Sequence, residues 1–125
     1  MTKEKDYFDN ITPKLVLAQL YKSANTMKLV QLKTNSRLVY DICKDYHMQL
    51  TDLVDKLSQA YFAIHKKKDV DDIPSAKYID PIMHMNDVIY YLETNSKVFK
   101  SHQEQFIVHK ILSKMTDVRF LLSLE

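Results

Sequence analysis

Histidines are the side chains best suited to binding a metal ion in this sequence, which has five of them. His102 and His109 are seven residues apart, which places both on one face of a helix, and His84 stands near the start of another helical pattern. Metal sites inside helical bundles typically take a Glu-x-x-His pair from each of two helices. No glutamate stands three residues before any histidine of this chain. We therefore expect no metal site, with a zinc or di-iron centre on these three histidines as the alternative.

Cys43 and His47 are the candidate nucleophile and base, because residues four apart on a helix can touch. A reactive thiolate needs an accessible, electropositive setting, whereas Cys43 lies within an apolar helical stripe. Asp69, Asp71 and Asp72 resemble a calcium loop in charge, but they lack the glycine and the ligand spacing of an EF-hand. We expect neither a catalytic residue nor a calcium site.

Glycine is absent from all 125 residues. Phosphate-binding loops and dinucleotide fingerprints need glycine, because their backbone must approach the ligand closely. Tight β-hairpin turns need positive φ angles that glycine adopts without strain. The sequence therefore predicts an all-helical protein that is not an enzyme and holds no cofactor.

Basic residues gather where the first two helical patterns meet, at Lys28, Lys33, Arg37 and Lys44. A helix–turn–helix there would place cations against the phosphates of DNA. The net charge is only +2, from 18 basic and 16 acidic residues. Arginine, the commonest reader of guanine edges, occurs only at Arg37 and Arg119. DNA binding is therefore the alternative function.

Large apolar side chains toward the C-terminus exceed what a single core stripe needs. Tyr90 and Tyr91 are adjacent, and neighbours on a helix point about 100° apart, so one core cannot bury both. Surplus apolar surface rich in tyrosine and methionine is typical of protein interfaces. The residues that we assign to such an interface are Met83, Tyr90, Tyr91, Phe120, Leu121 and Leu124. A wide core face is the alternative explanation.

Four amphipathic segments must position these residues. Thr12-Pro13 and Asp80-Pro81 each combine a capping side chain with a proline at the first helical position. Ser101 and Glu104 form a capping box. Apolar spacings of three and four then predict helices over residues 12–33, 36–67 and 80–97, and a fourth from residue 101 onward.

The links between these segments predict the architecture. Thr34-Asn35-Ser36 separates the first two helices in our interpretation, with one continuous helix as the alternative. Residues 1–11 are expected to be a flexible lead-in, and residues 69–80 form the long connection. Short links favour antiparallel packing. We predict a single domain over 1–125, an antiparallel four-helix bundle built from two helical hairpins, whose long second helix overhangs the bundle or meets another partner.

Charge is divided unevenly along the chain. Residues 1–68 hold 12 basic and 7 acidic residues, whereas residues 69–125 hold 6 basic and 9 acidic ones. We expect the two halves to pack together so that their fields partly cancel. The lone Cys43 fits a reducing compartment, and no apolar run reaches the roughly 18 residues of a membrane span. The cytoplasm is therefore the expected location.

Together these observations favour a small cytoplasmic protein that acts by binding another protein or a second copy of itself. A regulator, an adaptor or an inhibitor would each fit, and a two-fold homodimer is the expected oligomer. A DNA-binding regulator that uses the segment around Lys28–Lys44 is the second hypothesis.

Overall fold

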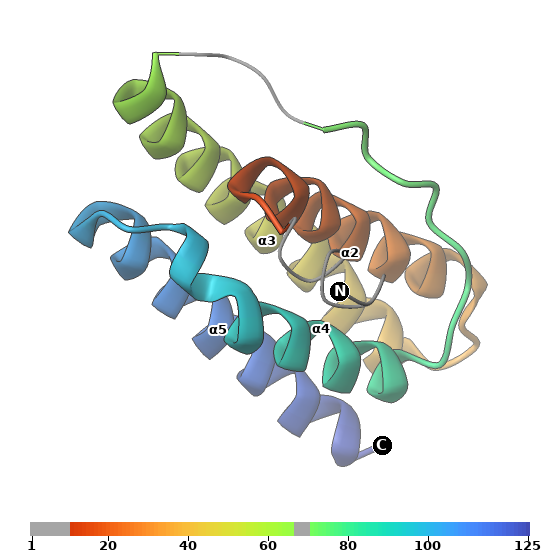
Figure 1. Ribbon diagram of the computed structural model, residues 1–125. Coiled ribbons are helices and arrows are strands. Elements are labelled where there is room, and N and C mark those ends of the chain that lie inside the picture. Colours follow the sequence, from red (N-terminus) through yellow and green to blue (C-terminus); the bar gives the residue numbers. More distant parts are fainter. Residues whose placement is uncertain (1–10, 67–70) are drawn as a thin grey trace, which may run out of the picture.

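The computed structural model describes residues 11–66 and 71–125, and these residues fold into four α-helices and one short 3₁₀-helix (Figure 1). The elements are α2 (Pro13–Lys33), α3 (Arg37–His65), α4 (Pro81–Asn95), the 3₁₀-helix η1 (Ser96–Val98) and α5 (His102–Ser123). The predicted all-helical class is confirmed. Residues 1–10 of the expected lead-in lie outside the described residues, as do Lys67, Lys68 and Asp69.

Each α-helix begins after a residue whose side chain accepts a hydrogen bond from a backbone amide of the first turn. These N-caps are Thr12 (3.2 Å from Leu15 N), Ser36 (3.2 Å from Val39 N), Asp80 (3.0 Å from Met83 N) and Ser101 (3.1 Å from Glu104 N). The Glu104 carboxylate accepts in return from Ser101 N at 3.1 Å, which completes the predicted capping box. The caps predicted at Thr12, Asp80 and Ser101 are confirmed, and α2 and α3 are separate helices.

The C-terminus of α3 carries a left-handed residue that is not glycine. Lys66 has φ 54° and ψ 31°, and its N–H donates to the Phe62 carbonyl at 2.6 Å. Glycine usually fills this position, because a Cβ there crowds the following carbonyl. A lysine therefore adopts a strained conformation here, while its charge suits the negative end of the helix dipole.

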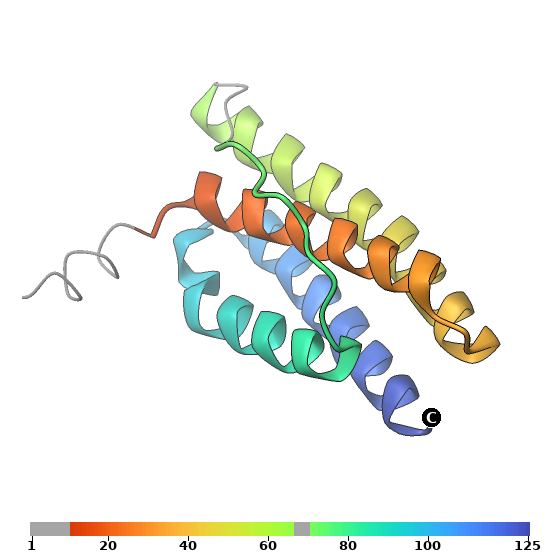
Figure 2. The same ribbon diagram turned by 90° about the vertical axis from the view of Figure 1, so that its right-hand side faces the viewer.

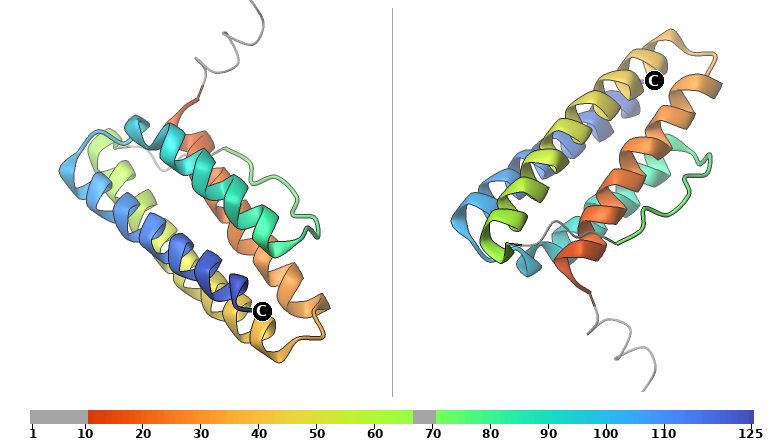
Figure 3. Two further views of the ribbon diagram at one scale, coloured as in Figure 1. Left: turned by 90° about the horizontal axis from the view of Figure 1, so that it is seen from below. Right: turned by 90° about the horizontal axis from the view of Figure 1, so that it is seen from above.

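The four helices surround one core in the order α2, α3, α5, α4, and neighbouring helices run antiparallel (Figures 1 and 3). Since α3 and α4 lie diagonally and run in the same direction, the chain returns along the bundle between them. The described part of this return, residues 71–80, passes beside α2 and is here called the crossover segment (Figure 2). The predicted antiparallel bundle of two hairpins is confirmed, in an up-down-down-up order.

One apolar stripe from each helix forms the core, and the segment after η1 closes one end of it. Phe99 is fully buried there, with its ring centroid 6.4 Å from that of Tyr61. Because of this contact, the stripe of α3 stays buried as far as Tyr61, and the expected overhang is reduced to the last turn of the helix.

Two residues predicted to lie on core stripes are instead exposed. Ile64 is 48% exposed in the last turn of α3, and Ile82 is 39% exposed in the first turn of α4. Both have the correct helical phase for the core. The prediction was wrong because a periodic pattern does not reveal where the neighbouring helices end.

Candidate functional site

Exposed bulky apolar side chains occur on α4 and α5, and we call four of them, on α4 and at the C-terminal end of α5, the α4–α5 patch. Met83 and Tyr90 of α4 are 58% and 73% exposed, and Phe120 and Leu124 of α5 are 62% and 63% exposed. Met83 and Tyr90 are seven residues apart, and Phe120 and Leu124 are four apart. Each pair therefore shares one face of its helix.

A single contact aligns these two helix faces. Arg119 Nη1 donates to Asn86 Oδ1 at 3.4 Å. Asn86 lies between Met83 and Tyr90 on α4, and Arg119 directly precedes Phe120 on α5. The last turns of α5 thus lie beside the first turns of α4, as Figure 3 shows, so that the two exposed pairs belong to neighbouring helices.

Leu121 lies on another side of α5. It follows Lys114 by seven residues, and Lys114 Nζ is 2.6 Å from Asp45 Oδ2 on α3. Because residues seven apart share a helix face, Leu121 belongs to the side of α5 that faces α3. It is 42% exposed there.

Tyr91 also points away from the patch. It is partly buried against the core and lines a groove between α2 and α4. Tyr90 borders the same groove but is 73% exposed, so the adjacent tyrosines differ in burial, as their spacing predicts. Of the six residues assigned to an interface, four lie in the patch, and Leu121 and Tyr91 lie on either side of it.

Charges around the patch are mostly acidic. Within Pro81–Asn95, α4 contains the exposed Asp87 and Glu93 and has no lysine or arginine. Asp117 and Glu125 add two exposed carboxylates on and after α5, whereas Arg119 contributes a cation. A rim of this sign complements a partner surface that carries basic residues.

The residues of the DNA-binding alternative lie around the link between α2 and α3. They are Lys28, Lys33, Arg37 and Lys44. Arg37 Nε is 3.3 Å from Asp41 Oδ2, and Lys33 Nζ lies 5.5 Å from the centre of the Tyr78 ring. Lys28 is half-buried. Local partners and burial thus reduce the cationic surface that this segment offers to phosphates.

His84, a metal candidate from the sequence, is instead part of a polar network in the interior. Its Nε2 lies 2.7 Å from Ser23 Oγ, which lies 2.7 Å from the hydroxyl of the fully buried Tyr46. Burial lowers the pKa of His84 to about 4. The negative charge of Asp87 acts in the opposite direction and raises this pKa, whereas the positive charge of Lys22 lowers it further. The neutral imidazole is the form that this site favours.

The other candidates for chemistry lie apart from one another. Burial raises the pKa of the Cys43 thiol to about 11. His47 donates from Nδ1 to the Ala24 carbonyl at 2.7 Å, which directs its ring toward α2. His102 and His109 are exposed on α5. Nowhere in the described part of the chain do three histidine, cysteine, aspartate or glutamate side chains gather as a metal site would need.

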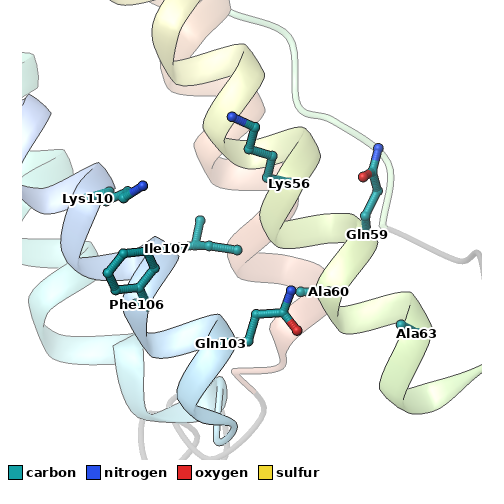
Figure 4. Close-up of a pocket in the computed structure, with 8 residues that line it drawn as sticks. All are labelled: Lys56, Gln59, Ala60, Ala63, Gln103, Phe106, Ile107 and Lys110. Atoms are coloured by element: carbon teal, nitrogen blue, oxygen red, sulfur yellow. The ribbon is translucent and has the colours of Figure 1, made fainter.

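Two hollows in the surface differ in what they offer a ligand. A shallow cleft of about 390 Å³ between α3 and α5 is lined by Lys56, Gln59, Phe106 and Lys110, among others (Figure 4). The lysine and glutamine side chains that line this cleft extend separately from α3 and α5 and form no buried polar cluster. The groove between α2 and α4 is larger, at about 960 Å³, and contains Ser23 and His84 in its wall.

Sequence reasoning missed this groove. Its wall joins residues from distant parts of the chain: Ser23 is 23 positions from Tyr46 and 61 from His84. A signal was present, because Ser23 and Thr26 interrupt the apolar face of α2 and are nonetheless buried. Buried hydroxyls of this kind require hydrogen-bond partners, and here one of these partners, His84, lies across the groove.

No protein-family model, curated protein or solved structure matches this chain. Among the helices of the described residues, none has the length and apolar character that crossing a bilayer requires. The functional argument therefore rests on the side chains themselves.

Proposed function

We propose that this protein acts by binding another protein through the α4–α5 patch, as a regulator, adaptor or inhibitor. The observation that carries the proposal is that two neighbouring helices carry four bulky apolar side chains, each more than half exposed. Single exposed apolar residues are normal, whereas aromatic and methionine side chains grouped within a polar rim are typical of interfaces. A cytoplasmic location and a non-catalytic role belong to the same proposal.

The chemistry of the rim narrows the class of partner. Asp87, Glu93, Asp117 and Glu125 favour a contact surface that is apolar at its centre and basic at its edge. In a two-fold homodimer the same patch of two copies would meet, and their acidic rims would repel one another. We therefore favour a different protein as the partner, with self-association as the competing outcome.

Affinity capture with matched variants tests this proposal. Tagged wild-type protein is incubated with nuclease-treated extract of its own host cells, and bound proteins are quantified by mass spectrometry. We expect one protein in near-equimolar amount, lost with the double variant Met83→Glu/Tyr90→Glu. The control Leu32→Glu/Met48→Glu changes two residues of the other hairpin, 66% and 61% exposed, and should capture it normally.

The competing functions give different results in the same system. Loss of all captured material on nuclease treatment, with an affinity that falls steeply as salt rises, would support DNA binding instead. A concentration-dependent dimer of the purified chain in sedimentation, abolished by Met83→Glu/Tyr90→Glu, would make a second copy the partner. Equal capture by both double variants would contradict the assignment of the patch.

A further inference from the structure

The groove between α2 and α4 has the size of a ligand site. It borders the α4–α5 patch at Tyr90, which belongs to both, whereas Met83, Phe120 and Leu124 do not line it. Its volume of about 960 Å³ is within the range of small-molecule pockets, roughly 300–1,000 Å³. The two helices form its sides, and Ser75, Lys77, Tyr78 and Ile79 of the crossover segment line it as well. Figure 2 shows this segment passing beside α2.

A hydrogen-bond chain joins three residues at the wall of this groove. The hydroxyl of the fully buried Tyr46 lies 2.7 Å from Ser23 Oγ, which in turn lies 2.7 Å from His84 Nε2. The serine oxygen has two lone pairs and one hydrogen, so it can bond to both neighbours in either tautomer of the imidazole. The second ring nitrogen of His84, Nδ1, has no hydrogen-bond partner among the described residues. His84, which lines the groove, therefore has one ring nitrogen left for a ligand.

Cations outnumber anions among the residues that line the groove. Lys22 and Lys77 both line it, and neither forms an ion pair with a described residue. Asp87 is the opposing carboxylate in the lining. Lys22 lies close enough to His84 for its charge to act on the imidazole. Asp87 acts on the imidazole with the opposite sign. Two ammonium groups against one carboxylate nevertheless give the lining a net positive charge, which favours an anionic group.

Apolar and aromatic side chains line much of the rest of the groove, alongside the polar Gln19, Thr26, Thr94 and Asn95. Val88 and Tyr91 come from α4, Ile79 comes from the crossover segment, and Ile11 lies just before α2. Surfaces of this kind bind the hydrocarbon part of a ligand, while a few placed polar groups fix its orientation.

We propose that this groove binds an amphiphilic organic anion, a molecule with a carboxylate or similar acid on an aliphatic or aromatic body. The acid group lies between Lys22 and Nδ1 of His84, in the tautomer that carries its hydrogen there, with Lys77 at the crossover segment adding attraction. The body lies against Val88 and Tyr91. This site does not depend on the partner proposed for the α4–α5 patch.

Two probes with the same hydrocarbon chain test the proposal. The full-length protein is titrated with decanoate and, separately, with 1-decanol at pH 7.5, and the His84 ring and backbone amides are followed by NMR. We expect saturable binding of decanoate, centred on His84 and Val88, at least about tenfold tighter than that of 1-decanol. Equal binding of the two probes would overturn the proposal, as would shifts centred on Met83, Phe120 and Leu124, the patch residues that do not line the groove.

Variants test the role of the cations. Lys22→Gln should raise the Kd for decanoate about tenfold, which is the effect of losing one charge-assisted contact. Lys56→Gln, in the cleft between α3 and α5, is the matched control and should leave the Kd unchanged. Unaltered binding by a folded Lys22→Gln protein would contradict the assignment of the anion site, and so would the absence of saturable binding by the wild type.

Discussion

His84 is the residue whose chemistry the fold changes most. Its side chain is buried beside Ser23, and its pKa falls from 6.5 to about 4. Protonation would place a positive charge on the imidazole. Withdrawal of the ring from water disfavours that charge, and this is the main cause of the lowered pKa. The folded site therefore favours the neutral imidazole.

This preference predicts a loss of stability in mild acid. Between pH 6.5 and about 4, the unfolded chain binds a proton at this residue and the folded chain does not, so the free energy of unfolding falls as pH falls. The full effect is about 3 kcal/mol. Denaturant unfolding at several pH values should show that His84→Gln reduces this dependence, with His109→Gln as the exposed control. Parallel profiles for the wild type and His84→Gln would contradict the account.

The residue scale also shows what sequence reasoning can reach. Thr12, Asp80 and Ser101 were identifiable as caps, because each partner amide lies three positions along the chain. The bond between Ser23 and His84 spans 61 positions, and it exists only because the crossover sets α4 against α2. A hydrogen bond between near neighbours in the chain, such as an N-cap, can be predicted from the sequence alone. A hydrogen bond between distant residues can be predicted only when the topology is known.

At the scale of elements, the end of α3 illustrates the consequence of lacking glycine. Lys66 adopts the left-handed region at φ 54°. This conformation costs a non-glycine residue roughly 1–2 kcal/mol, which a glycine at this position would not lose. Glycine is also more flexible in the unfolded chain, and this offsets about 0.4–1 kcal/mol of that gain in stability.

Lys66→Gly should therefore stabilise the protein by about 0.5–1 kcal/mol. Chemical denaturation measures the change. Lys44→Gly makes the same substitution at an exposed position inside α3 and should instead destabilise by about 1 kcal/mol. A destabilising effect at both positions would show that the left-handed conformation at Lys66 carries no strain.

Helical periodicity predicted correctly which face of α3 is buried along most of its length, but it did not predict burial at the end of the helix. Val39, Cys43, Tyr46 and Leu50 follow the expected stripe and are buried. Ile64 has the same phase but is exposed, because burial at a helix end depends on the length of its neighbours. The same reasoning explains why Tyr90 and Tyr91 differ, since their spacing alone predicts that they diverge.

At the scale of the whole molecule, the crossover decides which helices meet. Two hairpins were predictable from three caps and three links, but the order α2, α3, α5, α4 was not. Only this order places α4 beside α2 and creates their groove. It also packs helices of the basic first half of the chain against helices of the acidic second half. The ion pair of Lys114 and Asp45 joins the two halves, with its lysine in the acidic half and its aspartate in the basic half.

Two phenylalanines on one face of α5 provide the most direct test of the proposed function. Phe106 and Phe120 are 61% and 62% exposed, but only Phe120 lies in the α4–α5 patch. The decisive measurement is the Kd of the captured partner protein for Phe120→Glu and for Phe106→Glu. A central interface residue contributes at least about 2 kcal/mol, so Phe120→Glu should weaken binding by at least about thirtyfold, while Phe106→Glu stays close to wild type. Equal effects of the two variants, or a larger effect of Phe106→Glu, would contradict the account.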